Sequence, residues 1–276
     1  METFGRTAVI GCGNLGGVLV RGLARKLYTD PSQVIVFDQH QDKVRLLVQQ
    51  LGVSTAKTLS EIARNAGTII IAVKPKDVPV VLGTLREALE KESNEPLLVS
   101  VAAGITLASM AQQLGSKIRR VARAMPNIAV LVSEGMTAVY ATAERDRAFL
   151  EKVFSTVGRT ITVEYEEDLD AVTGLSATGP AFFFTVIEGM IAGGVKMGLS
   201  RERALLLATQ TMRGSAALLQ ETGKHPAELR DLVTSPAGTT IAGLQVLEDR
   251  GLRGTLIEAV GASVERAREL ANRSKE

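Results

Sequence analysis

The segment Gly11–Gly16 reads G-C-G-N-L-G, the glycine spacing of loops that bind the pyrophosphate of a dinucleotide. Gly11 permits a tight turn, Gly13 lets the backbone approach the phosphates, and Gly16 allows a helix to pack closely on a strand. The pattern alone is weak, because glycine accounts for 26 of 276 residues. Its context is strong, because it follows the apolar run Thr7–Ile10 and opens a segment with helical spacing, whose free N–H groups would face the phosphates.

Asp38 ends the next apolar run, Val34–Phe37, and lies 22 residues after Gly16. This is the place of the acid that binds the ribose of a dinucleotide. A carboxylate there favours the bare ribose of NADH and repels the 2′-phosphate of NADPH. Lys43 or Arg45 could offset that repulsion, although both fit the solvated face of a helix better. The sequence therefore predicts a dinucleotide site whose acidic residue favours NADH.

Composition excludes several other classes of protein. Thirty-two Lys and Arg against 30 Asp and Glu leave a net charge of +2, without the clustered basic excess of a nucleic-acid-binding surface. No uninterrupted apolar run reaches the roughly 18–20 residues of a membrane span, and the N-terminus lacks a signal-peptide pattern. No Cys/His set has metal-site spacing, and the single cysteine, Cys12, fits a small residue in a cofactor loop better than a nucleophile. We therefore expect a cytoplasmic enzyme or nucleotide-binding protein.

Short apolar runs alternate with helical patterns in the first half of the chain. Several runs are continuous Val, Ile and Leu, as in strands covered on both faces, and their succession with helices indicates a doubly wound, mainly parallel sheet. Helical spacing marks residues 15–27, 41–51 and 78–89. The predicted strands are Thr7–Ile10, Val34–Phe37, Thr68–Val73, Leu97–Val101, Ile118–Arg123, Thr137–Tyr140 and Thr160–Val163.

After about residue 163 no further strand is predicted, and the signals that begin and end helices become explicit. Pro180 suits a first helical turn, and Ser200 can cap the helix that follows. We therefore divide the chain into an α/β dinucleotide-binding domain, residues 1–163, and an all-helical domain, residues 164–276. The predicted helices of the second domain are residues 181–197, 201–221, 226–233, 239–247 and 252–271.

The predicted helices of the second half are apolar on more than one face. Phe182, Phe183 and Phe184 are consecutive, and so are the leucines of Leu205–Leu207. A central position within one chain or a partner subunit could cover these side chains. The sequence leaves both readings open.

Seven short segments, which occur in a fixed order along the chain, together match the pattern of one protein family. The most specific is 225–241, which contains His225, Pro226 and the run D-L-V-T-S-P-A-G-T-T-I. The others are Gly11–Gly16, 72–75 (A-V-K-P), 100–106 (S-V-A-A-G-I-T), 123–127 (R-A-M-P-N), 170–181 (D-A-V-T-G-L-S-A-T-G-P-A) and 194–199 (G-V-K-M-G-L). Over nearly its whole length the chain resembles the pyrroline-5-carboxylate reductase family.

The resemblance implies a Rossmann domain followed by a helical dimerisation domain, and NAD(P)H-dependent reduction of 1-pyrroline-5-carboxylate to L-proline. NADPH is the cofactor that the family implies, and its homodimers can associate into decamers. The glycine pattern and the resemblance together assign cofactor binding to Gly11, Cys12, Gly13, Asn14, Leu15, Gly16, Asp38, Ala72, Val73, Lys74, Pro75, Ala102, Ala103, Gly104, Met125, Pro126 and Asn127. Asp38 departs from the family, in which many members have a neutral or basic residue at that place. It assigns substrate binding to Ser235, Gly238, Thr239 and Thr240, with Thr240 donating a hydrogen bond at the imine nitrogen.

Reduction of a cyclic imine requires a hydride at carbon and a proton at nitrogen, and the hydride belongs to the cofactor. The chain has only two histidines and shows no obvious strong general acid, so a substrate that is already protonated would leave positioning as the main contribution. The backbone N–H groups of 238–240, at a helix start after a proline turn, suit the substrate carboxylate. Simple N-capping is the alternative reading of Thr239 and Thr240. The acidic run Glu164–Asp168 is expected to be a solvated helix start.

The loop departs from the family pattern at Ala237, where the family usually has glycine. A positive φ at this residue would cost stability that glycine avoids, whereas a negative φ would accommodate alanine.

Two other functions remain open on the sequence alone. A β-hydroxyacid dehydrogenase has a similar layout, but its catalytic lysine is followed three residues later by asparagine, whereas Lys196 is followed by Leu199. A non-catalytic nucleotide sensor would keep Gly11–Gly16 and would not need the loop Ser235–Ile241.

Overall fold

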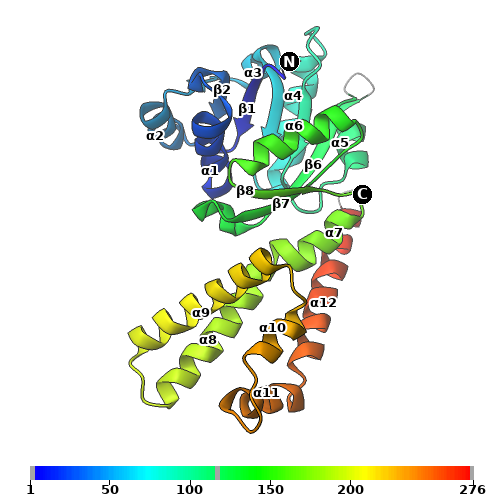
Figure 1. Ribbon diagram of the computed structural model, residues 1–276. Coiled ribbons are helices and arrows are strands. Elements are labelled where there is room, and N and C mark those ends of the chain that lie inside the picture. The colour runs from blue at the N-terminus through cyan, green and yellow to red at the C-terminus, as the bar shows by residue number, and fades with distance from the viewer. Residues whose placement is uncertain (1–3, 116–118, 274–276) are drawn as a thin grey trace. The chain divides into compact units, whose positions relative to one another are not determined.

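The computed structural model describes residues 4–115 and 119–273, which form two compact units (Figure 1). The first unit extends to Thr178 and takes in the chain again from Ser263. The second unit is Gly179–Ala262.

The first unit is built on an eight-stranded sheet with the order β3-β2-β1-β4-β5-β6-β7-β8. Every neighbouring pair is parallel except β6 and β7, which confirms the predicted mainly parallel sheet. The two-residue strand β3 was not predicted, and Ile118 of one predicted strand lies outside the described residues. The strands are β1 (Arg6–Ile10), β2 (Val34–Phe37), β3 (Ser54–Thr55), β4 (Ala66–Ile71), β5 (Leu97–Ser100), β6 (Val121–Pro126), β7 (Gly135–Ala141) and β8 (Gly158–Thr162).

Helices cover both faces of this sheet. Successive residues of β1 enter opposite apolar clusters, with Val9 on one face and Ala8 and Ile10 on the other, as a sheet buried on both sides requires. The predicted helices 41–51 and 78–89 are confirmed, whereas α3, α5 and α6 were not predicted. The helices of this unit are α1 (Asn14–Gly22), α2 (Gln41–Leu51), α3 (Leu59–Asn65), α4 (Val78–Leu89), α5 (Leu107–Leu114), α6 (Glu144–Ser155) and α7 (Asp168–Val172).

The strand order reverses at β1, because the chain passes from β1 outward to β2 and β3 and then returns to β4 on the other side. Open parallel sheets bind ligands beyond the carboxyl ends of the strands at such a reversal. The loops that follow β1 and β4 therefore form the expected ligand-binding edge.

The second unit is helical. Helices α8 and α9 pack through a small core of Ile191, Ala204 and Ala208, and the absence of a side chain at Gly194 lets α9 approach closely, since a Cβ there would lie 3.2 Å from Ala204 Cβ. Ser200 caps α9 as predicted, because its Oγ accepts a hydrogen bond from the Arg203 N–H at 3.3 Å. The helices are α8 (Gly179–Lys196), α9 (Arg201–Thr222), α10 (Pro226–Leu232), α11 (Thr239–Asp249) and the first half of α12 (Leu252–Arg273).

The apolar residues of α8 and α9 are not covered by the part of the chain that the structure describes. Phe183 is 58% exposed, Phe184 is 60% exposed and Leu206 is 68% exposed. A central position within one chain is therefore the wrong reading of these helices.

The compact units do not divide at residue 163. Leu169 of α7 is fully buried and packs with Met125 and Ala138 of the sheet, so α7 belongs to the first unit by its contacts. Ala267 and Ala271 near the end of α12 are also buried in that unit. Helical spacing alone could not show that α7 packs on the sheet or that the end of α12 belongs to the first unit.

Candidate functional site

Two glycines of the loop after β1 are required by its geometry. Gly11 has φ +97°, and a Cβ there would lie 2.7 Å from the carbonyl oxygen of Ala72. A Cβ on Gly16 would lie 1.8 Å from the carbonyl oxygen of Gly11. The reasons given for these glycines, a tight turn and close packing of helix on strand, are confirmed.

The middle of this loop faces open space. No atom lies within 4 Å of the position that a Cβ on Gly13 would take, and α1 begins at the next residue, Asn14. The first N–H groups of a helix have no partner within the helix. An open backbone followed by a helix N-terminus fits the pyrophosphate of a dinucleotide.

Asp38 is buried at the end of β2 and contacts the same loop. Its Oδ2 accepts a hydrogen bond from the Cys12 N–H at 2.7 Å, and its Oδ1 accepts one from the His40 N–H at 2.7 Å and lies 3.0 Å from His40 Nδ1. Burial opposes ionisation of Asp38, but the hydrogen bonds from His40 and Cys12 outweigh it and hold its pKa below the ordinary value. A charged carboxylate therefore lies directly against the glycine loop.

Cys12 is a buried thiol beside that carboxylate. Burial, and then the charge of Asp38, raise the pKa of Cys12 to about 12. The thiolate is the reactive form of cysteine, so this environment opposes nucleophilic or redox chemistry. The structure agrees with the interpretation of Cys12 as a small loop residue.

We expect Cys12 in the native protein to react with iodoacetamide at pH 8 at least ~100-fold more slowly than an ordinary free thiol, because little thiolate is present. Mass spectrometry over time measures the rate. The matched control is the same protein in concentrated urea, where the single thiol is exposed. Equal rates in the two conditions would contradict the raised pKa.

The other predicted cofactor residues follow neighbouring strands at the same edge. The Ala72 N–H donates to Ile10 O at 2.8 Å and the Val101 N–H donates to Ile71 O at 3.2 Å, so the chain leaves β1, β4 and β5 side by side. Lys74 is exposed in the loop after β4. Ala102, Ala103 and Gly104 follow β5, and Met125 and Pro126 end β6.

Asn127 has a structural contact that the sequence did not predict. Its Oδ1 accepts hydrogen bonds from the Ala129 and Met136 N–H groups, each at 3.2 Å. The side chain therefore ties the turn after β6 to the start of β7.

The loop 235–240 belongs to the second unit. The Gly238 N–H donates to Ser235 O at 3.0 Å, which closes a β-turn with Pro236 and Ala237 in its centre. Ala237 has φ +58°, which is the positive φ that the sequence analysis identified as unfavourable for alanine. In this left-handed conformation its methyl group costs about 1 kcal/mol relative to glycine. A Cβ on Gly238 would lie 2.3 Å from Ser235 Oγ and 3.2 Å from Ser235 O, so a side chain there would require the Ser235 hydroxyl group to move.

Simple N-capping does not account for the two threonines of this loop. Helix α11 is preceded by Gly238 as its N-cap, and no side chain forms the capping hydrogen bond. Within residues 4–115 and 119–273, the hydroxyl groups of Ser235, Thr239 and Thr240 have no hydrogen-bond partner. They are available to a ligand at a helix N-terminus.

Sequence reasoning missed a buried ion pair. Arg123 Nη1 donates to Glu166 Oε1 at 2.8 Å, with the two side chains 4% and 22% exposed. The same Glu166 oxygen accepts from the Leu107 N–H at 2.7 Å, so one carboxylate joins β6, the start of α5 and the chain before α7. The expectation of a solvated acidic run is therefore wrong for Glu166. An arginine between apolar residues of a predicted strand, V-A-R-A-M, is the signal that could have indicated a buried partner.

The parallel sheet with its glycine loop, followed by a helical domain, defines a Rossmann-type NAD(P)-dependent oxidoreductase. Residues 6–104 match the family model described as NADP oxidoreductase, coenzyme F420-dependent, and residues 166–270 match the one described as pyrroline-5-carboxylate reductase dimerisation. A pyrroline-5-carboxylate reductase of Methanosarcina acetivorans is 40% identical over 268 residues, which cover 96% of this chain and 97% of that protein. The chain belongs to the pyrroline-5-carboxylate reductase family.

Other relatives agree with this assignment. The Escherichia coli pyrroline-5-carboxylate reductase is 38% identical over 95% of this chain and 97% of its own length. The solved structure of the Coxiella burnetii enzyme has a TM-score of 0.90 and 33% identity, with 98% of this chain and 99% of that chain covered. A Plasmodium falciparum pyrroline carboxylate reductase with NADP bound has a TM-score of 0.82 and 26% identity, with 97% and 98% covered.

Proposed function

We propose that this protein reduces 1-pyrroline-5-carboxylate to L-proline with a nicotinamide cofactor, as the last step of proline biosynthesis. The observation that carries the proposal is the 40% identity to the M. acetivorans reductase over 96% of this chain. Both predicted parts of the site support it, since the glycine loop fits a pyrophosphate and the hydroxyl groups of 235–240 are free to bind a substrate.

The proposed roles follow from the local geometry of each part. Gly13 and the N-terminus of α1 hold the pyrophosphate, and Ala102–Gly104 with Met125 and Pro126 line the nicotinamide. The cofactor supplies the hydride. The N–H groups of Thr239 and Thr240 at the start of α11 hold the substrate carboxylate, since the Gly238 N–H already donates to Ser235 O. The free Thr240 hydroxyl donates to the imine nitrogen. No side chain of the loop is a strong acid, so the substrate enters as its protonated iminium and the loop contributes positioning.

Oxidation of NADPH and NADH with pyrroline-5-carboxylate, followed by cofactor absorbance and by identification of L-proline, tests the function. A six-membered cyclic imino acid in parallel determines whether the loop distinguishes ring size. Purified protein that binds the cofactor but turns over neither imine would contradict the proposal, and would favour a nucleotide sensor.

The cofactor preference is proposed from Asp38. We expect Asp38→Asn to raise the ratio of kcat/KM for NADPH to that for NADH by about 10-fold, because it removes a charge that repels the 2′-phosphate. Asparagine keeps an oxygen that can accept from the Cys12 N–H. Steady-state kinetics with both cofactors measure the ratio.

Asp42→Asn is the matched control for this substitution. Asp42 is an exposed carboxylate in the first turn of the adjacent α2 and pairs with Arg45. The control should leave the ratio unchanged. If Asp38→Asn also leaves it unchanged, Asp38 does not contact the ribose and acts only on the loop.

We also propose that the chain is a cytoplasmic homodimer whose dimers can form decamers, and that residues 164–276 contain the dimerisation and substrate-binding region. The dimerisation family model covers residues 166–270. A π-helix, Thr173–Ala177, lies between α7 and α8. The helical stretch Asp168–Lys196 that they form has the length and mean hydropathy to cross a membrane, and only 11% of its most apolar window is buried. A partner copy of the same helices supplies the apolar cover that such a surface needs.

We expect no stable folded monomer at micromolar concentration, because the exposed phenylalanines and leucines of α8 and α9 require cover. Analytical ultracentrifugation in detergent-free buffer measures the mass. A folded, active species near the chain mass of 29.3 kDa would contradict this expectation.

A further inference from the structure

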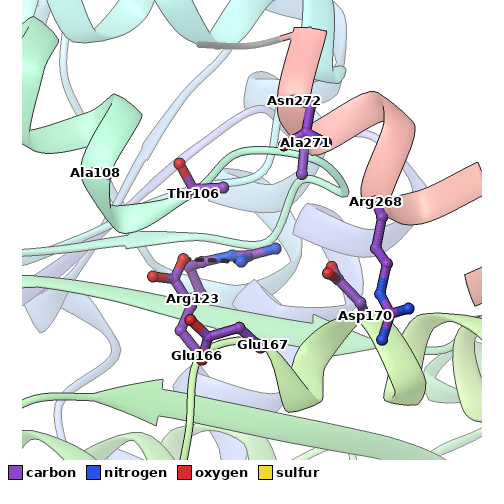
Figure 2. Close-up of a pocket in the computed structure, with 9 residues that line it drawn as sticks. All are labelled: Thr106, Ala108, Arg123, Glu166, Glu167, Asp170, Arg268, Ala271 and Asn272. Atoms are coloured by element: carbon purple, nitrogen blue, oxygen red, sulfur yellow. Dashed lines mark hydrogen bonds and ion pairs between the residues drawn. The ribbon is translucent and has the colours of Figure 1, made fainter. Parts of the chain in front are cut away.

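A cavity of about 430 Å³ lies within the first unit, and no residue of the glycine loop lines it (Figure 2). It opens to solvent and is lined by the start of α5, strand β6, helix α7 and the last turns of α12. Its charged and polar lining includes Thr106, Arg123, Glu166, Glu167, Asp170 and Arg268. Neither the proposed cofactor residues nor the loop 235–240 contribute to it.

Arg123 provides a buried cation in this cavity. The residue is 3% exposed, and one of its N–H groups donates to Glu166. A guanidinium carries five N–H donors. Figure 2 shows the guanidinium extending from the ion pair into the cavity between Thr106 and Asp170. It can therefore donate to a second anion without losing Glu166.

Three further charged side chains of the lining are uncommitted. Among the residues that the structure describes, the side chains of Glu167, Asp170 and Arg268 have no hydrogen-bond or ion-pair partner. Figure 2 shows Asp170 from α7 and Arg268 from α12 reaching toward the same space. Glu167 and Arg268 are exposed and Asp170 is half-buried, so these charges lie at the mouth of the cavity, where they can pair with a ligand that carries both signs.

The charges of the lining indicate the net charge of a ligand that fits the cavity. Two arginines and three carboxylates give the lining a net charge of −1, so a ligand of net charge +1 neutralises it. An anion such as phosphate would approach three carboxylates. Among the described residues, no group of three or more His, Cys, Asp or Glu side chains is placed so that it could hold a metal ion.

We propose that this cavity binds a basic α-amino acid, one with a carboxylate and two cationic groups. The carboxylate of the ligand lies between Arg123 and Arg268, where guanidinium groups pair well with carboxylates. Its two cations lie at Glu167 and Asp170. The bound ligand connects α7 to the end of α12 and to the segments next to two proposed cofactor loops, since Thr106 follows Gly104 and Arg123 precedes Met125.

Calorimetric titration of the full-length protein with L-lysine tests the proposal. Two matched compounds each lack one feature, because L-norleucine lacks the side-chain cation and 1,5-diaminopentane lacks the carboxylate. We expect L-lysine to bind with a Kd of about 1 mM or tighter, and each of the other two at least ~10-fold more weakly. Absence of L-lysine binding up to about 10 mM, or equal binding of all three compounds, overturns the proposal.

Two substitutions in the lining determine where the ligand binds. We expect Arg268→Gln to weaken the binding of L-lysine at least ~10-fold, because the contact to its carboxylate is lost. The same substitution should not weaken the binding of 1,5-diaminopentane, which has no carboxylate and is repelled by Arg268 in the unmodified protein. Asp170→Asn is expected to lower the affinity for L-lysine toward the affinity for L-norleucine. Glu265→Gln, on an exposed residue of α12 outside the cavity, is the matched control and leaves L-lysine binding unchanged.

Thermal unfolding and basal reductase activity confirm that these variants are folded. Arg268 and Asp170 are both assigned to a site separate from the proposed reaction, so the basal activity is expected to remain. If L-lysine binds equally well to folded Arg268→Gln and Asp170→Asn proteins, it binds elsewhere and the assignment to this cavity is overturned. Failure of reductase activity in the unmodified protein would contradict the proposed function and would not affect this binding result.

Discussion

Replacement of Glu166 by alanine is expected to lower the free energy of unfolding by about 3 kcal/mol. The substitution leaves the Arg123 guanidinium, 4% exposed, without the carboxylate that lies 2.8 Å from it. It also removes the acceptor of the Leu107 N–H at the start of α5. A buried cation without a partner is among the most costly defects that one substitution can create. Chemical denaturation of the variant and the unmodified protein measures the difference.

Glu167→Ala is the matched control for this experiment. Glu167 is the adjacent exposed carboxylate, and no described residue bonds to its side chain, so its replacement should change stability by less than about 0.5 kcal/mol. A loss as small for Glu166→Ala as for Glu167→Ala would mean that water solvates Arg123 in the native protein. Glu166→Gln retains an acceptor for the Leu107 N–H, so its loss in the free energy of unfolding is expected to lie between those of Glu166→Ala and Glu167→Ala.

Replacement of Thr240 by valine is expected to lower kcat by roughly 10- to 100-fold, because valine keeps the shape of threonine and removes the hydroxyl group. Loss of one positioned donor at an oxyanion site costs about 10²–10³ in rate, and a protonated iminium needs that donor less than an oxyanion does. The Thr240 hydroxyl has no partner among the described residues and α11 is capped without it, so its removal breaks no internal hydrogen bond. Steady-state kinetics with pyrroline-5-carboxylate measure the effect.

Thr240→Ser separates a role in the reaction from a role in folding. Serine retains the hydroxyl and should restore most of the turnover, whereas a packing role would be restored by valine and not by serine. The dissociation constant of the cofactor should be the same in all three proteins, since the Thr240 loop and the glycine loop belong to different units. Unchanged kcat in a folded Thr240→Val protein would remove Thr240 from the proposed reaction.

Structural features that depend on a short stretch of the chain could be predicted from the sequence. Several strands of the first unit are short Val, Ile and Leu runs whose burial requires little knowledge of the rest of the chain. Six of the seven predicted strands match the structure within two residues at each end. Gly11 and Gly16 were predicted because a positive φ and a missing side chain are requirements of single residues. The resemblance to the reductase family, carried by short segments in a fixed order, predicted the family correctly.

At two places the sequence indicated the alternatives but did not decide between them. It indicated that Ala237 would be costly at a positive φ, but the sign of φ depends on the turn that Ser235 and Gly238 close. It left two positions open for the apolar helices α8 and α9, and the exposure of Phe183 and Phe184 decided between them.

Only the tertiary structure decided which polar and charged groups meet. Cys12 and Asp38 are 26 residues apart in the chain, and Arg123 and Glu166 are 43 residues apart. Periodicity gives the face on which a side chain lies but not its partner on another element, because the partner depends on strand order and on how α7 packs on the sheet. The same uncertainty made Glu166 look like a solvated residue of an acidic run. Electrostatic interactions are strong only when the two groups lie within a few ångströms of each other. The packing of the sheet and its covering helices determines which groups lie that close.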